Sequence, residues 1–296
     1  MAITAADVSK LRKMTGAGIM DCKKALTEAN GDFDAAIDII RKKGQAIANK
    51  RSDRDASEGV VLSKVTADGK KGAILVLNCE TDFVAKNESF IALAQSILDL
   101  ALSSNAANVE DVMGLTLDGI AVKDVITHQI GVIGEKLDLP YYDVIKAESV
   151  VAYIHPGNKL ATLVGFNKGG VEVQVGRDVA MQVAAMNPVS VNRDSVPQSV
   201  IDKELEIAKE QTRLEGKPEE MVEKIALGRL SKFFKESTLL EQIFVKDGKI
   251  SVKEYIQKAD KELTVTEFRR YSLNKIKEVV QLRATSFCFI TRGTQH

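Results

Sequence analysis

The spacing of apolar residues near the start of the chain predicts three short helices that pack as a domain over residues 1–45. Thr4 and Asp7 have the pattern of a capping box at the start of the first helix. The stretch "TGAG" and the dipeptide Asn30-Gly31 separate the helices. The apolar positions that recur at helical spacing are Val8, Leu11, Ala25, Leu26, Ala29, Phe33, Ala36, Ile37 and Ile40.

The polar stretch that follows, residues 46–57, shows no apolar period. Its basic residues, Arg51 among them, alternate with Asp53 and Asp55. A site for phosphate groups is therefore disfavoured, and the stretch is predicted to be a solvated linker.

Two later segments have the same pattern of apolar runs around a glycine turn. "EGVVLSKVTADGKKGAILVL" turns at Gly69 and "ESVVAYIHPGNKLATLVGF" turns at Gly157, and each predicts a β-hairpin followed by a helix. The apolar run at residues 72–77 has the composition of a buried strand. The chain is therefore expected to have an α+β core of two related subdomains with antiparallel sheets, over residues 58–140 and 141–274.

Residues 198–235 differ from both, because they read as two charged amphipathic helices joined by a short turn. Helices of similar length around a short turn favour an antiparallel helical hairpin, here inserted in the second subdomain. The last stretch, residues 275–296, has four basic residues and one acidic residue and is treated as an atypical tail without an assigned role.

The composition of the chain disfavours several classes of function. The 296 residues contain 41 Lys and Arg and 41 Asp and Glu, so the formal net charge is +0, which disfavours direct binding to nucleic acid. Neither a membrane-spanning run nor a secretory signal is visible, and the three separated cysteines suit a reducing compartment. We expect a cytoplasmic protein that does not bind membranes.

The sequence contains few of the motifs that carry catalytic chemistry. The nucleotide-binding patterns G-x-x-x-x-G-K-[ST] and G-x-G-x-x-G and the nucleophile pattern G-x-S-x-G are all missing. The three histidines lack the spacing of metal ligands, and Glu80 and Asp82 resemble an ordinary pair of turn carboxylates. We therefore expect a protein that is not an enzyme, with no catalytic residues, no metal site and no cofactor.

Two short segments stand out as candidate surfaces. In "NCETDFVAKNESF", Phe83 follows Asp82 where the chain should turn, so it is either a core residue or an apolar group presented to a partner. Ile19 and Met20 directly follow a glycine turn. At a helix start, apolar residues either staple the helix to the core, which spacing alone favours, or form an exposed anchor.

These segments resemble, in order and separation, the elongation factor Ts family, the bacterial guanine-nucleotide exchange factors for elongation factor Tu. "LRKMTGAGIMDCKKALTEANGDFDAAI" and "NCETDFVAKNESF" are similar to the two signatures of that family. Later blocks such as "YIHPGNKLATLVGF" and "GKPEEMVEKIALGRLSKFFKESTLLEQIFVKD" are similar too, and the resemblance covers about residues 1–271. It implies a three-helix N-terminal domain of the ubiquitin-associated type, two related core subdomains and an inserted hairpin.

The resemblance also implies a role for each segment. The partner would be elongation factor Tu, both bound to GDP and free of nucleotide. The residues that match the family's magnesium-dislocation segment are Thr81, Asp82, Phe83 and Val84. Asp82 and Phe83 would reach between two helices of the partner's nucleotide domain.

The same resemblance assigns two further contacts. Ile19, Met20 and Lys23 would contact another helix of that domain, and the second core subdomain would dock elsewhere on the partner. Gln182 lies on the family's partner-facing side, where histidine is frequent, and an amide keeps hydrogen-bonding capacity but cannot carry charge.

Two other functions remain open alongside exchange. One is a ubiquitin-associated-like scaffold or chaperone-type adaptor that uses the helical hairpin, binds through Ile19 and Met20 and is indifferent to residues 81–84. The other is an RNA-binding translation protein, which the balanced charge disfavours. A homodimer is left open as well.

Overall fold

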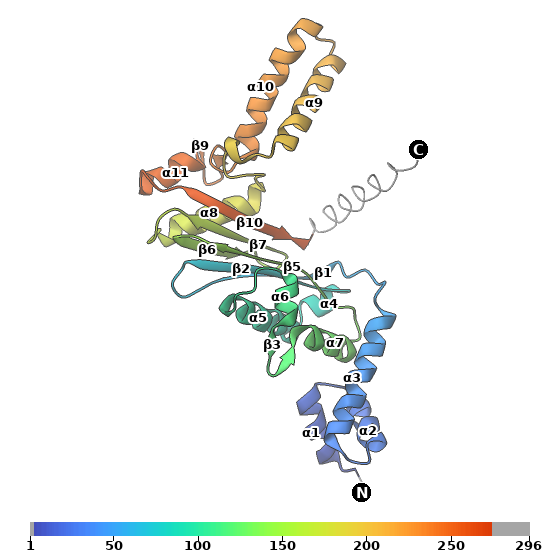
Figure 1. The fold of residues 1–296 in the computed structure, drawn as a ribbon. Helices are drawn as coiled ribbons and strands as arrows, with labels where there is room; N and C mark the ends of the chain where they lie inside the picture. The colour runs from blue at the N-terminus through green and yellow to red at the C-terminus, as the bar shows by residue number, and fades with distance from the viewer. Residues whose placement is uncertain (1–2, 274–296) are drawn as a thin grey trace. The chain divides into compact units, whose positions relative to one another are not determined.

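The computed structural model describes residues 3–273, which divide into two compact units (Figure 1). In that part of the chain, the first unit contains residues 3–62, 75–143 and 272–273. The second unit contains residues 63–74 and 144–271. Helices and antiparallel strand pairs occur together, so the expected α+β class is confirmed.

The first unit begins with the three predicted helices. They are α1 (Ala5–Thr15), α2 (Ile19–Glu28) and α3 (Phe33–Lys50). The capping box of Thr4 and Asp7 is present, because each side chain accepts a hydrogen bond from the other residue's backbone N–H. Helix α1 ends at Gly16, whose φ of 67° lies in the left-handed region that glycine adopts without strain.

Helix α3 runs further than expected, because residues 46–50 of the predicted linker are helical. The reason is a close crossing with α7 (Val122–Ile133), in which Gly44 lies against Gly131. A Cβ atom built on Gly131 would come within 2.6 Å of the Gly44 Cα atom. Because glycine has no side chain, this packed face of the helix is missing from the apolar pattern of the sequence.

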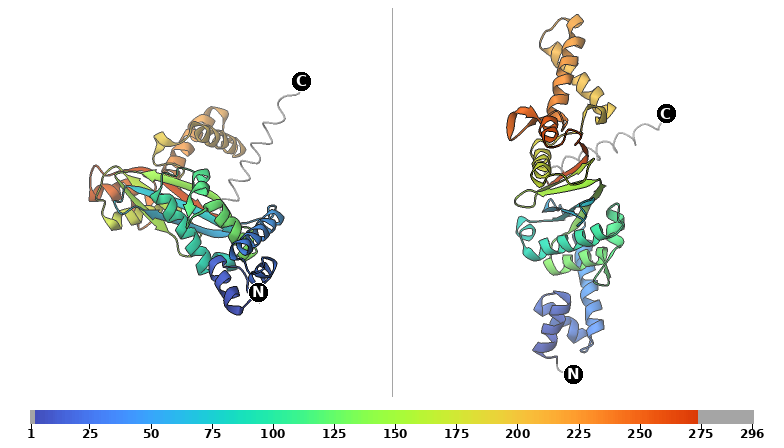
Figure 2. Two further views of the ribbon diagram at one scale, coloured as in Figure 1. Left: turned by 60° about the horizontal axis from the view of Figure 1, so that its bottom comes forward. Right: turned by 90° about the vertical axis from the view of Figure 1, so that its left-hand side faces the viewer.

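The remainder of the first unit places helices against a three-stranded sheet with the order β1-β2-β5 (Figure 2). The strand residues 63–65, 71–74 and 144–146 of this sheet are counted in the second unit. Helix α5 contributes an apolar face that includes Phe90, Ile97 and Leu98, all essentially inaccessible to solvent. The elements in chain order are β1 (Glu58–Val65), β2 (Lys71–Cys79), α4 (Asp82–Ala85), α5 (Glu88–Ser103), α6 (Val109–Gly114), β3 (Thr116–Leu117), β4 (Ile120–Ala121), α7 and β5 (Asp138–Lys146).

The second unit is built on a sheet with the order β10-β7-β6. Strands β6 (Ser149–Ile154) and β7 (Leu160–Phe166) are antiparallel, with Ser149 opposite Phe166 and Ile154 opposite Ala161. Helix α8 (Val173–Met186) packs on this hairpin. In both sheets, the strand that follows the helices joins the second strand of the hairpin, which agrees with the predicted repeat. The other elements are η1 (Arg193–Ser195), β8 (Ile243–Phe244), β9 (Asp247–Ser251), α11 (Val252–Ala259) and β10 (Val265–Ser272).

The predicted helical hairpin is confirmed as α9 (Gln198–Leu214) and α10 (Glu219–Ser237), which lie side by side (Figure 1). Small and apolar side chains fill the seam between them, since Ala208, Thr212, Val222, Ala226 and Leu230 are buried. Ion pairs on the outside, such as Arg229 with Glu215 at 2.6 Å, add little because they are partly solvated.

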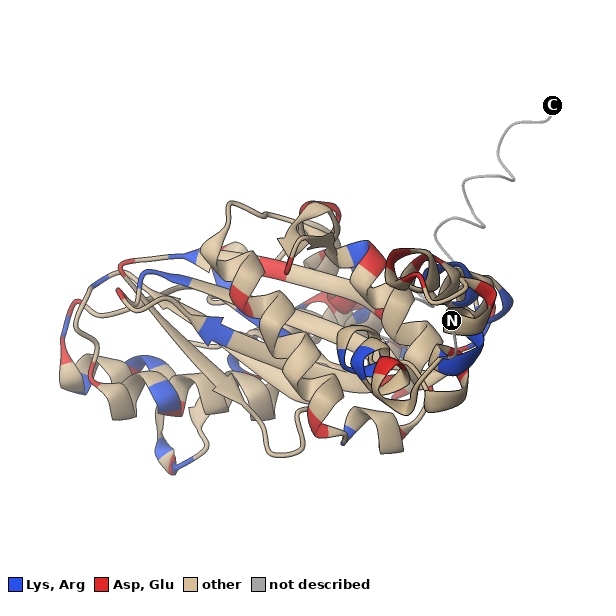
Figure 3. Ribbon diagram, turned by 90° about the horizontal axis from the view of Figure 1, so that it is seen from below, with Lys and Arg blue, Asp and Glu red and all other residues tan. Residues whose placement is uncertain are grey.

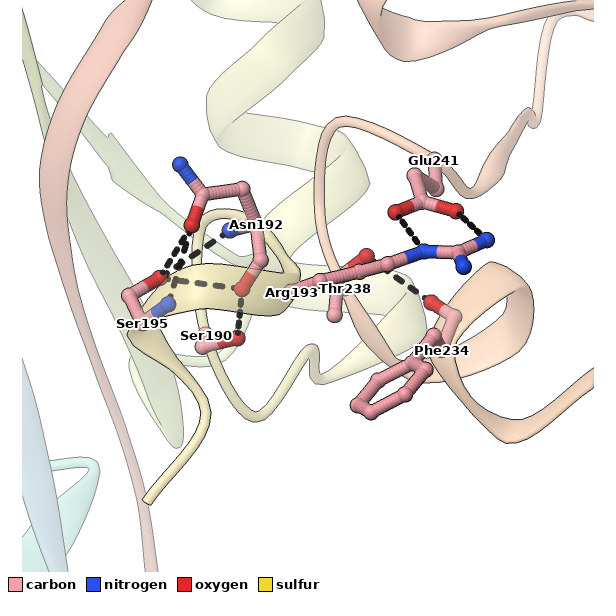
Figure 4. A network of polar contacts seen from close by, with 7 residues as sticks. All are labelled: Ser190, Asn192, Arg193, Ser195, Phe234, Thr238 and Glu241. Atoms are coloured by element: carbon pink, nitrogen blue, oxygen red, sulfur yellow. Dashed lines mark hydrogen bonds and ion pairs between the residues drawn. The ribbon is translucent and has the colours of Figure 1, made fainter. Parts of the chain in front are cut away.

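The base of the hairpin is held by a compact polar network (Figure 4). Arg193 donates two hydrogen bonds to Glu241, at 2.5 and 2.6 Å, and its guanidinium lies 5.3 Å from the centre of the Phe234 ring. The backbone of Leu239 donates to Ser190 at 2.9 Å. The chain entering α9 is therefore tied to the chain leaving α10.

Basic and acidic residues are interspersed along the helices and strands (Figure 3). This distribution agrees with the zero formal charge of the sequence. The tail predicted at residues 275–296 lies outside the described residues.

Candidate functional site

The segment Thr81–Val84 forms the start of a short helix between β2 and α5 (Figure 1). Strand β2 is buried along nearly its whole length up to Cys79, where the chain leaves the core. Thr81 then caps α4, since its hydroxyl accepts a hydrogen bond from the Val84 N–H at 3.4 Å. The local sequence thus makes a capped helical turn at the end of a buried strand.

This turn presents Phe83 to solvent. Its side chain is 82% exposed, whereas Ala85 two residues later is buried. The neighbouring Asp82 is half-exposed and pairs with Lys86 one turn further on, at 2.6 Å. Of the two interpretations of Phe83, a core residue is wrong, and a presented apolar group agrees with the structure.

Behind the turn lies a carboxylate that the sequence did not single out, Glu135. It accepts hydrogen bonds from the backbone N–H groups of Glu80 and Thr81, at 3.1 and 3.0 Å, and from the Thr81 hydroxyl at 2.7 Å. Glu135 follows the end of α7 in the sequence "GEK", which has no periodic or motif signal. Only the meeting of two loops that lie 54 residues apart reveals it.

The pKa values of two groups beside this turn, Glu80 and Cys79, are shifted in opposite directions. Burial alone would raise the pKa of Glu80, but the Lys136 N–H and the Arg51 guanidinium outweigh burial and hold the pKa below its ordinary value. Burial, with the Glu135 carboxylate nearby, raises the pKa of the Cys79 thiol to about 12. Glu80 is therefore an ionised acceptor at neutral pH, and Cys79 is an unreactive thiol.

The start of α2 also differs from the interpretation that spacing favoured. Ile19 and Met20 are 56% and 64% exposed, and Lys23 is exposed as well. The core of the three helices uses Cys22 and Leu26 from α2, which point the other way. Stapling by Ile19 and Met20 is therefore wrong, and the two side chains form an exposed apolar pair.

Gln182 lies inside the second unit, with no exposed area. Its amide nitrogen donates to the Gln242 side chain and to the Ile243 carbonyl, both at 3.1 Å, and its oxygen accepts from the Val245 N–H at 2.9 Å. The structure therefore places Gln182 beneath a surface segment in which Ile243 and Val245 are about half-exposed. Direct contact of Gln182 with a partner stays a prediction.

No group of three or more His, Cys, Asp and Glu side chains in residues 3–273 is placed to hold a metal ion. No helix within this part of the chain is both long and apolar enough to cross a membrane.

Comparison with known proteins identifies the family. A family model described as "Elongation factor TS" matches residues 80–275. An elongation factor Ts from Porphyromonas gingivalis is 54% identical over 275 residues, which cover 93% of this chain and 99% of that protein. The chain belongs to the elongation factor Ts family. Relatives of the same name from Amoebophilus asiaticus and Christiangramia forsetii are 54% and 52% identical and cover 91% and 92% of the chain.

The match to the elongation factor Ts family covers the segment that presents Phe83 and also Gln182. It ends at residue 275, where the atypical tail was predicted to begin. The exposed pair Ile19 and Met20 precedes the matched range of the family model.

Proposed function

We propose that this chain is a guanine-nucleotide exchange factor, which binds elongation factor Tu carrying GDP and speeds the release of the nucleotide so that GTP can bind. The observation that carries the proposal is the 82% exposure of Phe83 on a capped helical turn. Burial of this ring against a partner would remove its apolar surface from water, which is favourable.

The free energy gained by burying Phe83 is large enough to weaken nucleotide binding measurably if the ring is inserted as a wedge between two helices of the partner. Nucleotide held at nanomolar affinity is stabilised by about 12 kcal/mol, and each tenfold weakening removes roughly 1.4 kcal/mol. Burying Phe83 in a groove of the partner would supply about 1.5–3 kcal/mol. That energy separates two helices of the partner only if the rest of the interface holds the factor in place.

Asp82 has a second part in this proposal. Its carboxylate, next to Phe83 and half-exposed, would disturb the waters and hydrogen bonds around the partner's Mg²⁺ ion. Loss of the metal weakens the hold on the GDP phosphates, and no covalent bond of the nucleotide is made or broken. Linkage makes the effect mutual, so GDP must weaken the binding of the factor by the same ratio.

We assign the docking contact to α2. Ile19 and Met20 form an exposed apolar pair, and the adjacent Lys23 adds a positive charge at its border. Such a pair suits a groove between helices on the nucleotide domain of elongation factor Tu. The three helices that carry it would correspond to a domain of the ubiquitin-associated type.

A second docking contact would come from the other unit. Gln182 supports Ile243 and Val245 from below, so its part in partner binding would be to shape this half-exposed apolar segment. Histidine at the same position could make similar hydrogen bonds when neutral.

The test is stopped-flow release of a fluorescent GDP analogue from elongation factor Tu, measured against the concentration of the factor. Phe83→Ala is expected to lower the plateau rate by about tenfold or more, because the wedge acts after docking. Ile19→Ala with Met20→Ala is expected to raise the half-saturating concentration and to leave the plateau nearly unchanged.

The matched control is Leu214→Ala, which removes an equally exposed apolar side chain from the end of α9. It should exchange nucleotide at the wild-type rate. An unchanged release rate at micromolar wild-type factor would reject the proposal. Binding that depends on Ile19 and Met20 but is unaffected by the loss of Phe83 would favour the adaptor function.

A further inference from the structure

Two loops in the first unit are joined by a reciprocal pair of carboxylates. Glu135 accepts hydrogen bonds from the backbone of residues 80 and 81, and Glu80 in turn accepts one from the Lys136 N–H at 2.7 Å. Each glutamate therefore binds the backbone beside the other. We call Glu80 and Glu135 the carboxylate bracket.

The bracket extends to the end of α3. Arg51, which follows the last residue of that helix, donates to Glu80 at 2.7 Å. Lys136 reaches the same stretch from the other side, since its ammonium donates to the carbonyls of Ser52 and Arg54 at 2.7 and 3.0 Å. The bracket thus connects the chain leaving α3 with the turn that carries Phe83.

These contacts are of the stronger kind. Hydrogen bonds to an ionised carboxylate are shorter and about twice as strong as neutral ones. The Glu80 side chain is only 16% exposed, so water screens its bond to Arg51 less than it would at an open surface. The Cys79 thiol adds a weaker contact to the Thr81 carbonyl at 3.2 Å. Residues 79–81 are consequently held along their length.

The same end of α7 is fixed against α3. Gly131 crosses Gly44 at backbone contact, and Gly134 ends α7 in the left-handed conformation just before Glu135. Helices α3 and α7 both belong to the first unit and are labelled in Figure 1. The end of α7 is therefore a common support for α3 and for the turn with Phe83.

We propose that Glu135 and Glu80 are positioning residues for nucleotide exchange, which hold residues 81–84 in the conformation that enters the partner. The inference rests on the proposed exchange function and adds residues that do not touch the nucleotide or its metal. A segment that is already ordered loses less conformational entropy on insertion, so more of the docked complexes proceed to release. Through Arg51, the bracket also ties this turn to the end of α3, the last helix of the domain that carries Ile19 and Met20.

A purely structural role for the bracket makes a different prediction. It would lower overall stability and reduce the amount of folded factor, without changing the plateau rate per folded molecule. Positioning instead lowers the plateau rate and leaves the half-saturating concentration nearly unchanged, because docking through α2 remains. Local amide hydrogen exchange at residues 80 and 81 separates the two further, since global unfolding affects all protected amides.

The experiment uses the full chain with Glu135→Gln, which keeps the shape of the side chain and removes its charge. Fluorescent GDP release from elongation factor Tu is measured over a range of factor concentrations, together with hydrogen exchange read by mass spectrometry. We expect a plateau about tenfold lower, which corresponds to roughly 1.4 kcal/mol, and a half-saturating concentration within about twofold of wild type. The amides of residues 80 and 81 should exchange faster.

The matched control is Glu254→Gln. Glu254 also accepts a backbone N–H and a hydroxyl, both from Ser251 at the start of α11, at 2.7 and 3.0 Å. It makes the same kind of contact away from the turn, so the control should fray the start of α11 and leave the plateau unchanged. If Glu135→Gln fails to fold, Arg51→Met tests the bracket from its more exposed side, with an expected twofold to threefold loss of plateau rate.

Phe83→Ala, run in parallel, keeps the two proposals apart. If Phe83→Ala lowers the plateau rate of GDP release but Glu135→Gln does not, the positioning role alone is overturned. This holds whether or not the amides of residues 80 and 81 exchange faster. A full rate for Phe83→Ala would overturn the proposed wedge instead. A slow Glu135→Gln with faster local exchange and an unchanged melting temperature is the result that supports positioning.

Discussion

Phe83 and Phe90 lie on either side of the cap Asn87, and their side chains are 82% and 1% exposed. Phe83 sits on the short helix α4 and points to solvent, whereas Phe90 lies on the apolar face of α5. Two identical residues in one short segment thus have opposite environments, which gives an internal comparison for the role of Phe83.

Truncation of the two rings should affect stability very differently. Phe90→Ala is expected to lower the free energy of unfolding by about 3–5 kcal/mol, because it leaves a cavity in a packed core. Phe83→Ala should change it by less than about 0.5 kcal/mol, since the ring contacts little in the free protein. Urea unfolding followed by circular dichroism measures both. A loss above about 2 kcal/mol for Phe83→Ala would return that residue to the core.

Removal of the metal offers a test of Asp82. If its carboxylate acts through the Mg²⁺ ion of the partner, Asp82→Asn should slow GDP release at millimolar magnesium by about tenfold, roughly 1.4 kcal/mol. In excess EDTA the ion is already absent, so variant and wild type should release GDP at similar rates. The release rate of fluorescent GDP at both conditions is the measurement. An equal defect with and without magnesium would mean that Asp82 acts in docking or through its pair with Lys86.

The crossing of α3 and α7 predicts a steric effect at Gly131. A Cβ atom there would lie 2.6 Å from the Gly44 Cα, so Gly131→Ala should force the helices apart and cost about 1–3 kcal/mol. Gly228, inside α10, has no atom within 4 Å of such a Cβ. Gly228→Ala should therefore stabilise the chain by about 0.5–1 kcal/mol through helix propensity. Thermal melting of the two variants should show a lower melting temperature for Gly131→Ala and a higher one for Gly228→Ala.

The buried Gln182 should matter for folding. Gln182→Ala leaves the Gln242 side chain, the Ile243 carbonyl and the Val245 N–H without their partner, with an expected cost of about 2–4 kcal/mol. The control is Gln198→Ala, which removes an exposed contact in the first turn of α9 and should be nearly neutral. Urea midpoints give the comparison. A neutral Gln182→Ala would contradict a structural part for the amide.

Asp178 predicts a dependence of stability on pH. Burial alone would raise its pKa, but hydrogen bonds from Lys246, Tyr255 and Gln174, at 2.6, 2.8 and 2.6 Å, outweigh burial and hold the pKa below its ordinary value. A carboxylate with a lowered folded pKa stabilises the protein above its unfolded pKa of about 3.9, and this contribution is lost as the pH falls through the folded value.

Asp178→Asn should therefore cost about 2 kcal/mol at pH 7, and the difference from wild type should shrink below about pH 4. Asp260→Asn is the control, because Asp260 pairs with Lys168 at a half-exposed position. Its effect should be small at either pH. Unfolding in urea at pH 7 and below pH 4 measures both variants, and a constant difference for Asp178→Asn would contradict the assignment.

The local structure could be predicted from the sequence wherever interactions between neighbouring residues decide it. The capping box of Thr4 and Asp7, the glycine turns of the hairpins and the apolar face of α5 follow from neighbouring residues, and all are present. The two similar hairpins could be predicted for the same reason, because each depends on apolar runs around a local glycine turn. The antiparallel helices α9 and α10 were predicted from their amphipathic spacing and short connection.

Which apolar side chains face water became clear only from the folded chain. Phe83, Ile19 and Met20 had two possible environments each, because burial depends on what the rest of the chain brings against them. The extension of α3 was missed because its closest contact with α7 is made by Gly44, which leaves no apolar mark. The bracket of Glu80 and Glu135 was equally hidden, since hydrogen bonds between loops 54 residues apart exist only once the chain has folded.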